Sequence, residues 1–306
     1  MVALPNISSQ SGPQVTVNDW LKDPLRIPQY MVNIMDQGFL ADAVLRHAGA
    51  APAGVVRYNE TTPLYADSAS AARAEFGEVQ VARTSLGQPN VAYSVEQALA
   101  VVISDEDVRR SNVDKLNLRM QQVKNTIIRA WDDAFIAALL AASVQTAPVA
   151  LSWAVSTTDI RGDILAAMQL IEAAADANGS ILGYQADTLI VNRATKYNII
   201  RSTQFNAEYY GGDIADENLR YTGKLPQKIM GLNVLSSPRV PANKAILLQS
   251  GASGFIADEL PLQATPLYRD EPRKVSRSDI QRASAVGIDQ PKSVCILGGA
   301  NMDVAP

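Results

Sequence analysis

The chain has 306 residues, of which 47% are hydrophobic and 19% are charged, and its formal net charge is −4. This length allows two domains or one elaborate domain, and the composition is that of a folded, soluble protein with a large core. The net negative charge argues against tight binding to a nucleic-acid phosphate backbone, because such binding needs clustered Lys and Arg.

The residue types that carry most enzyme chemistry are scarce. Cys295 and His47 are the single cysteine and the single histidine, which excludes an intrachain disulfide and nearly excludes transition-metal sites and His-based triads. The phosphate-binding loop, the nucleophile elbow and the zinc-binding helix motif do not occur in the sequence. We therefore expect no enzyme activity, no metal and no cofactor. Without a signal peptide or an apolar window long enough for a membrane span, the protein is expected to be made in a cytoplasm.

Residues 1 to about 30 form an N-terminal arm that is rich in proline. Such a segment cannot build a core of its own, yet Trp20, Leu21 and Leu25 are too apolar for a solvated tail. Two interpretations are open: the arm crosses to another subunit, or it packs on its own domain. Residues 29–48 predict a short amphipathic helix that follows the arm.

Residues 54–65 and 76–103 contain stretches of alternating apolar and polar side chains, which predict two strands. The segment between them is small and polar, so the pair predicts a hairpin that projects beyond the body. A solitary two-stranded ribbon is only marginally stable in water, and we expect this one to rest on a neighbouring subunit. Arg57, Arg73 and Arg83 are candidates to pair with carboxylates of that neighbour.

Residues 104–142 contain neither Gly nor Pro and predict one long helix. Ser104 suits the N-cap, and three acidic residues follow it at the positive end of the helix dipole. At 1.5 Å per residue this helix is about 60 Å long. A dimeric coiled coil is the alternative, but the C-terminal third is apolar nearly all round, which favours burial in a globular body. The stripe expected to face that body consists of Val113, Leu116, Met120, Val123, Ile127, Trp131, Phe135 and Leu139.

The remainder of the chain predicts an α/β subdomain and several short strands. A helix over residues 159–177, a buried strand over 188–191 and a helix over 194–202 follow one another. An exposed loop is expected at residues 205–218. Further short strands are expected after Gly231 and at residues 245–249, 255–257, 281–288 and 293–297.

Three sequence segments carry a resemblance to a known family. They are Ile103-Ser104-Asp105-Glu106 at the start of the long helix, Asp187-Thr188-Leu189-Ile190-Val191-Asn192 before a helix, and Gly223-Lys224-Leu225 with Met230-Gly231-Leu232-Asn233-Val234 and the exit at Pro238. Together with the order of arm, hairpin, long helix and subdomain, they resemble the major capsid proteins of tailed bacteriophages, which have the Hong Kong 97 fold.

The resemblance implies an α+β fold built from four parts. Residues 1–48 would be the N-terminal arm with its short helix, and residues 50–92 the extended loop. Residues 93–147 and 262–306 would form the peripheral domain around the long spine helix, and residues 148–261 the axial domain. In this family the arm and the loop reach across neighbouring subunits, and the axial domains meet at the centres of the hexamers and pentamers.

The function implied is structural. The protein would self-assemble into the hexamers and pentamers of an icosahedral shell around a phage double-stranded DNA genome, as part of the virion, after assembly in the host cytoplasm. Portal and decoration proteins are implied partners, and packaged DNA would be contacted weakly and non-specifically, as suits an acidic protein. Because the sequence begins at Met1, we expect no fused leading segment, and a separate scaffolding protein is then implied.

Two other classes of protein compete with this interpretation. An encapsulin-type shell has the same fold but encloses a cargo protein; the long N-terminal arm favours the phage capsid. A non-viral α/β binding module would be a monomer with a pocket. Independently of any resemblance, two apolar extensions that cannot pack by themselves predict subunits that interlock, as a closed shell requires.

Overall fold

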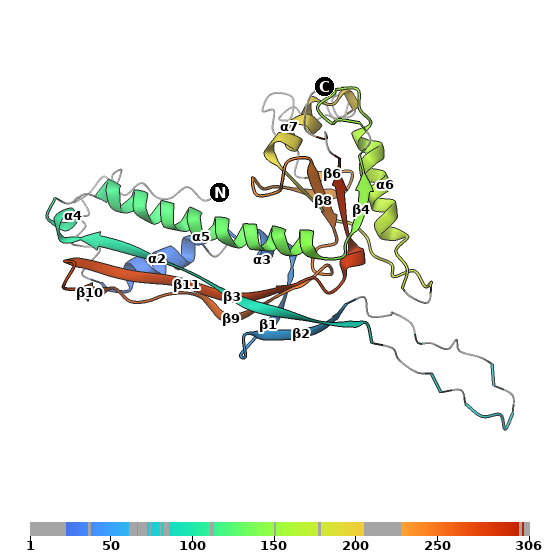
Figure 1. Ribbon diagram of the computed structural model, residues 1–306, viewed down its shortest axis with the longest axis horizontal. Coiled ribbons are helices and arrows are strands. Elements are labelled where there is room, and N and C mark those ends of the chain that lie inside the picture. The colour runs from blue at the N-terminus through green and yellow to red at the C-terminus, as the bar shows by residue number, and fades with distance from the viewer. Residues whose placement is uncertain are drawn as a thin grey trace.

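The computed structural model describes residues 23–35, 38–60, 66, 72–73, 75–79, 81–82, 86–110, 113–149, 151–176, 179–204, 228–299 and 302. Two six-stranded β-sheets organise this part of the chain. In Figure 1 the first sheet lies in a long body beneath the longest helix, and the second sheet stands in a separate block at one end of that helix.

The first sheet has the strand order β1-β9-β11-β3-β2, and β10 pairs with β11. Its longest strand, β3, pairs with β11 along residues 94–104 and with β2 along residues 88–93. The strands are β1 Arg46–Ala50, β2 Val55–Glu60, β3 Gln88–Ser104, β9 Phe255–Ala264, β10 Tyr268–Asp270 and β11 Val275–Gly287.

Four helices belong to this sheet: α2 Arg26–Met35, α3 Leu40–Val44, α4 Asp105–Arg109 and α5 Val113–Ala141. The single helix predicted over residues 29–48 is wrong, because α2, α3 and the start of β1 divide this segment. A Cβ at Gly38 would lie 2.5 Å from the Ile128 side chain, so a glycine lets the chain pass close to α5 between the two short helices.

The long helix predicted over residues 104–142 is also two helices. Ser104 caps α4 as predicted, since its side chain accepts from the backbone N–H of Asp107. However, α4 ends at Arg109, and α5 begins at Val113. Ser111 and Asn112 stand between them in the sequence, and these residue types compete with helical hydrogen bonds. The α5 helix is therefore about 44 Å long at 1.5 Å per residue, shorter than predicted.

The hairpin is present. The strand predicted over 76–103 is shorter, and residues 61–65 of the strand predicted over 54–65 lie outside the described residues. The ladder between β2 and β3 ends at the pair Glu60 and Gln88. Beyond it, the described residues 75–79 and 81–82 are in no strand, although their side chains alternate. In Figure 1 the described residues between β2 and β3 lie far outside the body, at the opposite end of the molecule from α4.

The second sheet has the strand order β4-β12-β8-β5-β7-β6. The predicted helix over residues 159–177 ends earlier, at Glu172, and its cap Asp159 accepts from the Gly162 N–H at 2.8 Å. Asn192 caps the next helix. The elements are β4 Gln145–Pro148, α6 Ile160–Glu172, β5 Thr188–Val191, α7 Arg193–Arg201, β6 Lys228–Ile229, β7 Leu232–Ser236, β8 Lys244–Leu248, the 3-10 turn Pro291–Ser293 and β12 Val294–Gly298.

The chain crosses between the two sheets more often than the predicted domain boundaries allow. β9 begins at Phe255, within the range 148–261, yet it pairs with β1 and β11 of the first sheet. β12 lies within the range 262–306, yet it pairs with β4 and β8 of the second sheet. Each sheet therefore contains strand residues from both sides of the predicted boundary between residues 261 and 262.

One hydrophobic cluster joins the two sheets. Phe135 and Leu139, near the end of α5, pack with Ile190 of β5, Ile246 of β8 and Ile256 of β9. The C-terminal end of α5 therefore contributes to a core that both sheets share, and the helix fixes one sheet relative to the other.

Candidate functional site

The inner face of α5 holds this helix on the first sheet. Leu116, Met120, Ile127 and Trp131 are buried, and Val123 is partly buried in the same cluster. These side chains pack against α2 and the long strands, which contribute Ile27, Met31, Val101, Ile103 and Ile280. The apolar stripe of α5 thus lies against the subunit's own sheet.

A buried arginine forms the polar centre beneath α5. Arg282 of β11 is only 4% exposed, and its guanidinium donates two hydrogen bonds of 2.8 Å to the Asp42 carboxylate of α3. A third contact, from Nη2 to Asp258 of β9, measures 3.2 Å. The guanidinium also lies over the rings of Phe39 and Trp131, at 4.8 and 5.5 Å from their centres. Such a paired and stacked cation ties α3, α5 and the sheet together.

A second polar cluster fixes the turn between α4 and α5. The Asp107 carboxylate accepts from Lys115 Nζ at 2.8 Å, from Arg119 Nη1 at 2.6 Å and from Ser104 Oγ at 2.8 Å. The hydrogen bond from Lys115, followed by those from Ser104 and Arg119, lowers the pKa of Asp107 to about 2 against the opposing effect of burial. The ionised carboxylate therefore links both helices to the end of β3.

The Asp107 cluster predicts an acid-sensitive contribution to stability. Since the folded-state pKa lies below the ordinary value of about 3.9, the contribution is complete above about pH 4 and is lost as the pH falls toward 2. We expect Asp107→Asn to lower the melting temperature at pH 7. We also expect it to flatten the decline in melting temperature between about pH 4 and pH 2. An unchanged pH profile in Asp107→Asn would contradict this role.

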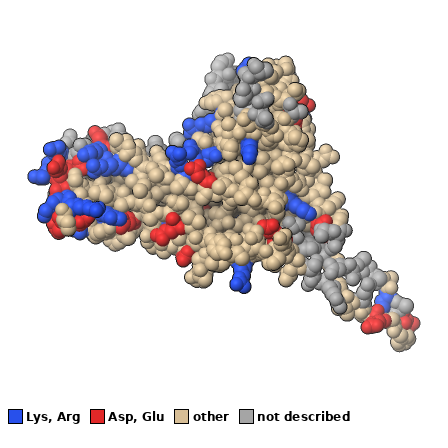
Figure 2. Space-filling model, viewed as in Figure 1, with Lys and Arg blue, Asp and Glu red and all other residues tan. Residues whose placement is uncertain are grey.

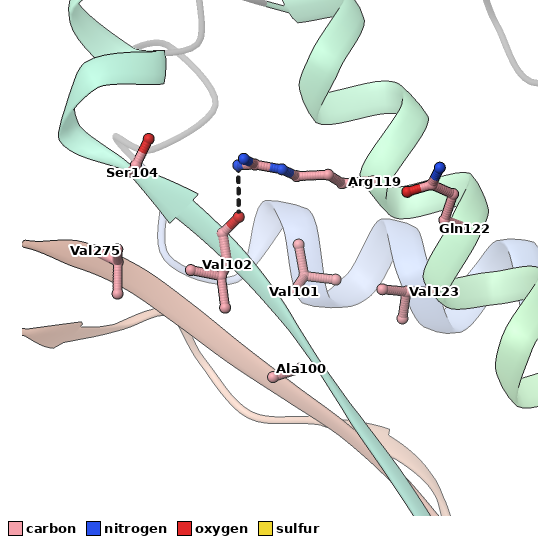
Figure 3. A pocket seen from close by; sticks show the side chains of 8 residues that line it. All are labelled: Ala100, Val101, Val102, Ser104, Arg119, Gln122, Val123 and Val275. Atoms are coloured by element: carbon pink, nitrogen blue, oxygen red, sulfur yellow. Dashed lines mark hydrogen bonds between the residues drawn. The ribbon is translucent and has the colours of Figure 1, made fainter. Parts of the chain in front are cut away.

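An apolar groove lies between β3 and α5 (Figure 3). Its volume is about 420 Å³, and its walls are Ala100, Val101, Val102, Ser104, Arg119, Gln122, Val123 and Val275. Arg119 reaches across it and donates from Nη1 to the Val102 carbonyl at 3.1 Å. The lining holds no pair of carboxylates and no nucleophile beside a base, so the groove suits an apolar chain segment better than a reaction.

The residues predicted to contact other subunits are spread over the chain. Trp20, Leu21 and Arg83 lie outside the described residues. Leu25, just before α2, is exposed, and so are Arg57 on β2 and Arg73 in the loop beyond it. Within the described part of the chain, neither of these arginines forms an ion pair with another described residue.

Sequence reasoning missed an exposed apolar face that runs along β3 and onto β2. Val55, Val91, Tyr93, Val95 and Leu99 are all exposed. They lie on one face, because Val55 pairs with Tyr93 and the β3 residues alternate by two. The alternation of apolar and polar residues in the sequence was the available signal, but it does not show whether other parts of the subunit cover the apolar face.

Charged side chains gather at the end of the body formed by α4 and β10 (Figure 2). Both signs are present there and pair with each other: Arg269 Nη2 donates to Asp105 at 2.6 Å, and Lys274 Nζ to Glu271 at 3.1 Å. A second group of Lys and Arg, with Asp or Glu beside it, lies where the block meets the long body, and the other charges on the visible face are scattered. This face therefore offers no continuous basic surface of the kind that binds a phosphate backbone tightly.

Among the described residues, no group of three His, Cys, Asp or Glu side chains could hold a metal ion. No described helix is both long enough and apolar enough to cross a membrane. The features that remain are an exposed apolar ribbon, a groove and a scaffold helix, and these are features of a protein that contacts other chains.

The sequence model of the phage capsid protein family matches residues 90–295. This stretch runs from β3 through α5 and both sheets into β12, and it is more than half of the chain. The chain belongs to the phage capsid protein family, and it is a structural protein of a capsid shell. No curated protein sequence matches it.

Solved capsid structures share its fold. The capsid of the cyanophage P-SCSP1u aligns with a TM-score of 0.60 at 13% identity, covering 84% of this chain and 86% of that chain. A structure from Mycobacterium phage Adephagia gives 0.58 at 13% identity, covering 88% and 92%. The virus-like particle from Pyrococcus furiosus gives 0.56 at 10% identity, covering 89% and 97%. The predicted α+β fold of the Hong Kong 97 type is confirmed.

Proposed function

We propose that this chain assembles into the hexamers and pentamers of an icosahedral capsid that encloses a phage double-stranded DNA genome. The observation that carries the proposal is the β2–β3 ribbon, on which Val55, Val91 and Tyr93 form an exposed apolar face. The opposite face of these strands packs on the subunit's own core through Val56, Tyr58 and Ala92, whereas the exposed face would be covered and stabilised by a neighbouring subunit. Arg57 and Arg73 would then pair with carboxylates of that neighbour.

The two sheets would have different places in the capsomer. The first sheet, with α5 on it, would form the peripheral part and contact adjacent capsomers. The second sheet with α6 and α7 would form the axial part and meet its copies at the capsomer centre. The shared cluster around Phe135 and Leu139 supports this division, because it lets one subunit carry both parts as a fixed unit.

The N-terminal arm would bind a neighbouring subunit through Trp20, Leu21 and Leu25. The arm proper must be shorter than the 30 residues first expected, because Ile27 and Met31 belong to the subunit's own core. Leu25, in contrast, is 45% exposed, as a residue awaiting a partner surface would be.

Removal of the arm tests whether it binds a neighbouring subunit or packs on its own domain. We expect a chain lacking residues 1–22 to keep the thermal transition of the isolated subunit within a few degrees, because α2 and its core contacts are intact. Shell yield should fall strongly, since burial of Trp20 and Leu21 against a neighbour is worth several kcal/mol at about 25 cal/mol per Å². Loss of the thermal transition would mean that the arm packs on its own domain. The chain lacking residues 1–28, which also loses Ile27, serves as the destabilised control.

The proposed partners follow from this assembly. A separate scaffolding protein would guide shell closure, a portal would replace one pentamer, and decoration proteins could bind the outer surface. DNA would be held inside without strong contacts, as the paired charges at the α4 end support. Assembly would take place in the host cytoplasm.

A shell that encloses a cargo protein is the second candidate, favoured by the likeness to the virus-like particle from Pyrococcus furiosus. Negative-stain microscopy of the chain, expressed alone and with its scaffolding protein, separates the candidates. A phage capsid gives closed shells whose number rises with scaffold and from which the scaffold is later absent. A cargo compartment gives uniform shells without scaffold that retain one foreign protein. Isolated single subunits under all conditions would contradict both.

A further inference from the structure

Helix α7 carries three cations on its outer side. Arg193, Tyr197 and Arg201 follow one another at intervals of four residues, which places them along one line of the helix, and all three are exposed. Lys196 lies beside this line and is partly exposed. The opposite side of the helix is buried in the block. We call Arg193, Lys196, Tyr197 and Arg201 the α7 face.

The cations of the α7 face are unpaired within the described subunit. No described carboxylate forms an ion pair with Arg193, Lys196 or Arg201, and α7 itself contains no acidic residue. By contrast, the cations beneath α5 and at the end of β3 are paired with aspartates. Three unpaired cations on one helix of a chain with a net charge of −4 point to an anion outside the subunit.

The surface beside the first turn of α7 does not cancel this charge. A hydrogen bond of 2.6 Å joins the residue before α7 to the loop that carries Arg239. Arg239 shares the Asp133 carboxylate with Arg129 of α5, at 3.7 Å from each. Asp132 is partly buried and accepts from the Leu40 amide. Two arginines and two aspartates leave no net charge at this place, so the α7 face keeps its positive potential.

Local helix stability does not account for Arg193. It is the first residue of α7, where the positive end of the helix dipole disfavours a cation. Asn192 already caps the helix by accepting from the Ala194 amide. A residue that opposes the local preference is expected where a function requires it. The charge of Arg193 is therefore better explained by a ligand than by the fold.

The two helices on the second sheet offer different surfaces. Ile164 of α6 and Ile199 of α7 belong to one hydrophobic cluster, and Figure 1 shows α6 along one side of the block and α7 near its top. The outer side of α6 exposes Leu165 and Leu170, and such apolar surface suits contact with another subunit. The α7 face exposes charge instead, and burial of unpaired cations against a protein is costly. A polyanion is the partner that matches it.

The spacing of the α7 face suits a nucleic-acid duplex. Arg193 and Arg201 are about 12 Å apart along the helix at 1.5 Å per residue, and the major groove of B-form DNA is also about 12 Å wide. The two guanidinium groups can therefore contact phosphates on both sides of one groove. The Tyr197 hydroxyl can donate to a phosphate oxygen as well. Contacts of this kind position a duplex without reading its base sequence.

We propose that the α7 face binds phosphates of the packaged double-stranded DNA and lies on the inner wall of the shell. Each contact is weak, because three cations neutralise few phosphates. A duplex along the wall would meet the α7 faces of several subunits, so that the weak contacts add. This inference rests on the proposed function, and it specifies the surface that holds the genome.

The salt dependence of DNA binding counts the phosphate contacts. For the full-length subunit and a short labelled DNA duplex, the slope of log Kobs against log salt should be about −2.7, because each neutralised phosphate contributes about −0.9. Arg193→Gln/Arg201→Gln should change the slope to about −0.9. The matched control Arg269→Gln/Arg273→Gln removes the same charge from paired arginines at the α4 end and should leave the slope near −2.7. An unaltered slope in Arg193→Gln/Arg201→Gln, or no binding by the unaltered chain at low salt, would overturn the inference.

Acetylation of lysines in shells identifies what covers the α7 face. We expect Lys196 to react at least tenfold more slowly in DNA-filled shells than in empty shells of the same chain. Lys274, which pairs with Glu271 at the α4 end, should change less than twofold. Equal reaction of Lys196 in both shells would overturn the inference. If Lys196 were protected in both, the α7 face would be covered by protein, such as an acidic surface of another copy.

Failure of this inference differs from failure of the proposed function. Shells that form normally while Lys196 reacts equally with and without DNA would overturn the α7 face as the DNA contact and leave the shell standing. A chain that never forms shells would overturn the proposed function, whereas the salt slope of the subunit is measured without shells.

Discussion

Ile127→Asp is expected to lower the unfolding free energy of the subunit by about 4 kcal/mol, and its melting temperature by about 10 °C. Ile127 is buried between α5 and the first sheet, in the cluster that also contains Met120 and Trp131. A carboxylate at this position loses its hydration and finds no cation among the apolar side chains of the cluster. The helix would separate from the sheet, and shell assembly would fail with it.

The matched control is Asn125→Asp, because Asn125 is exposed on the same helix, two residues away. It adds the same charge and should change the unfolding free energy by less than about 0.5 kcal/mol. Thermal melts of both variants followed by circular dichroism decide the matter. Equal melting temperatures would show that the buried face of α5 has been assigned to the wrong residues.

Arg282→Met is expected to cost about 3–5 kcal/mol, because it removes the shared partner of two carboxylates under α5. Asp42 and Asp258 would then repel each other beside Phe39 and Trp131, which also lose the cation over their rings. The double variant Arg282→Met/Asp42→Leu should regain part of the loss, since it leaves fewer unpaired charges. Chemical unfolding of the single and double variants measures this coupling.

The control for Arg282 is Arg269→Met at the exposed end of the body. Arg269 also contacts an aspartate, Asp105, through its guanidinium, but both side chains are more than one-third exposed. Surface pairs of this kind contribute about 0–1 kcal/mol. If Arg269→Met destabilised the subunit as much as Arg282→Met, burial would not be the reason for the strength of the Arg282 contacts.

Local sequence signals predicted the elements whose causes are local. Ser104 and Asp159 cap helices because their side chains each accept from an amide three residues away. The strand at residues 188–191 was predicted from its run of apolar residues, and all four are buried. In each case the information lies within a few residues, so the sequence alone was sufficient.

Features that depend on distant residues could not be predicted. Arg282 meets Asp42 and Asp258 across the fold, and no spacing in the sequence relates these three positions. The same limit explains β12, which lies within the range 262–306 predicted for the peripheral domain but which pairs with β4 and β8. The predicted strand over 76–103 begins only at Gln88. Alternation shows that a segment is able to pair, but a strand forms only where a second strand lies beside it.

We propose that this chain builds closed shells through surfaces that its own subunit leaves uncovered. Light scattering of the purified protein, over a range of salt and protein concentrations and with the proposed scaffolding protein present, measures whether such shells form. We expect particles of uniform size and of a mass many times that of the 32.9 kDa subunit. A single species at the mass of the subunit under every condition would contradict it.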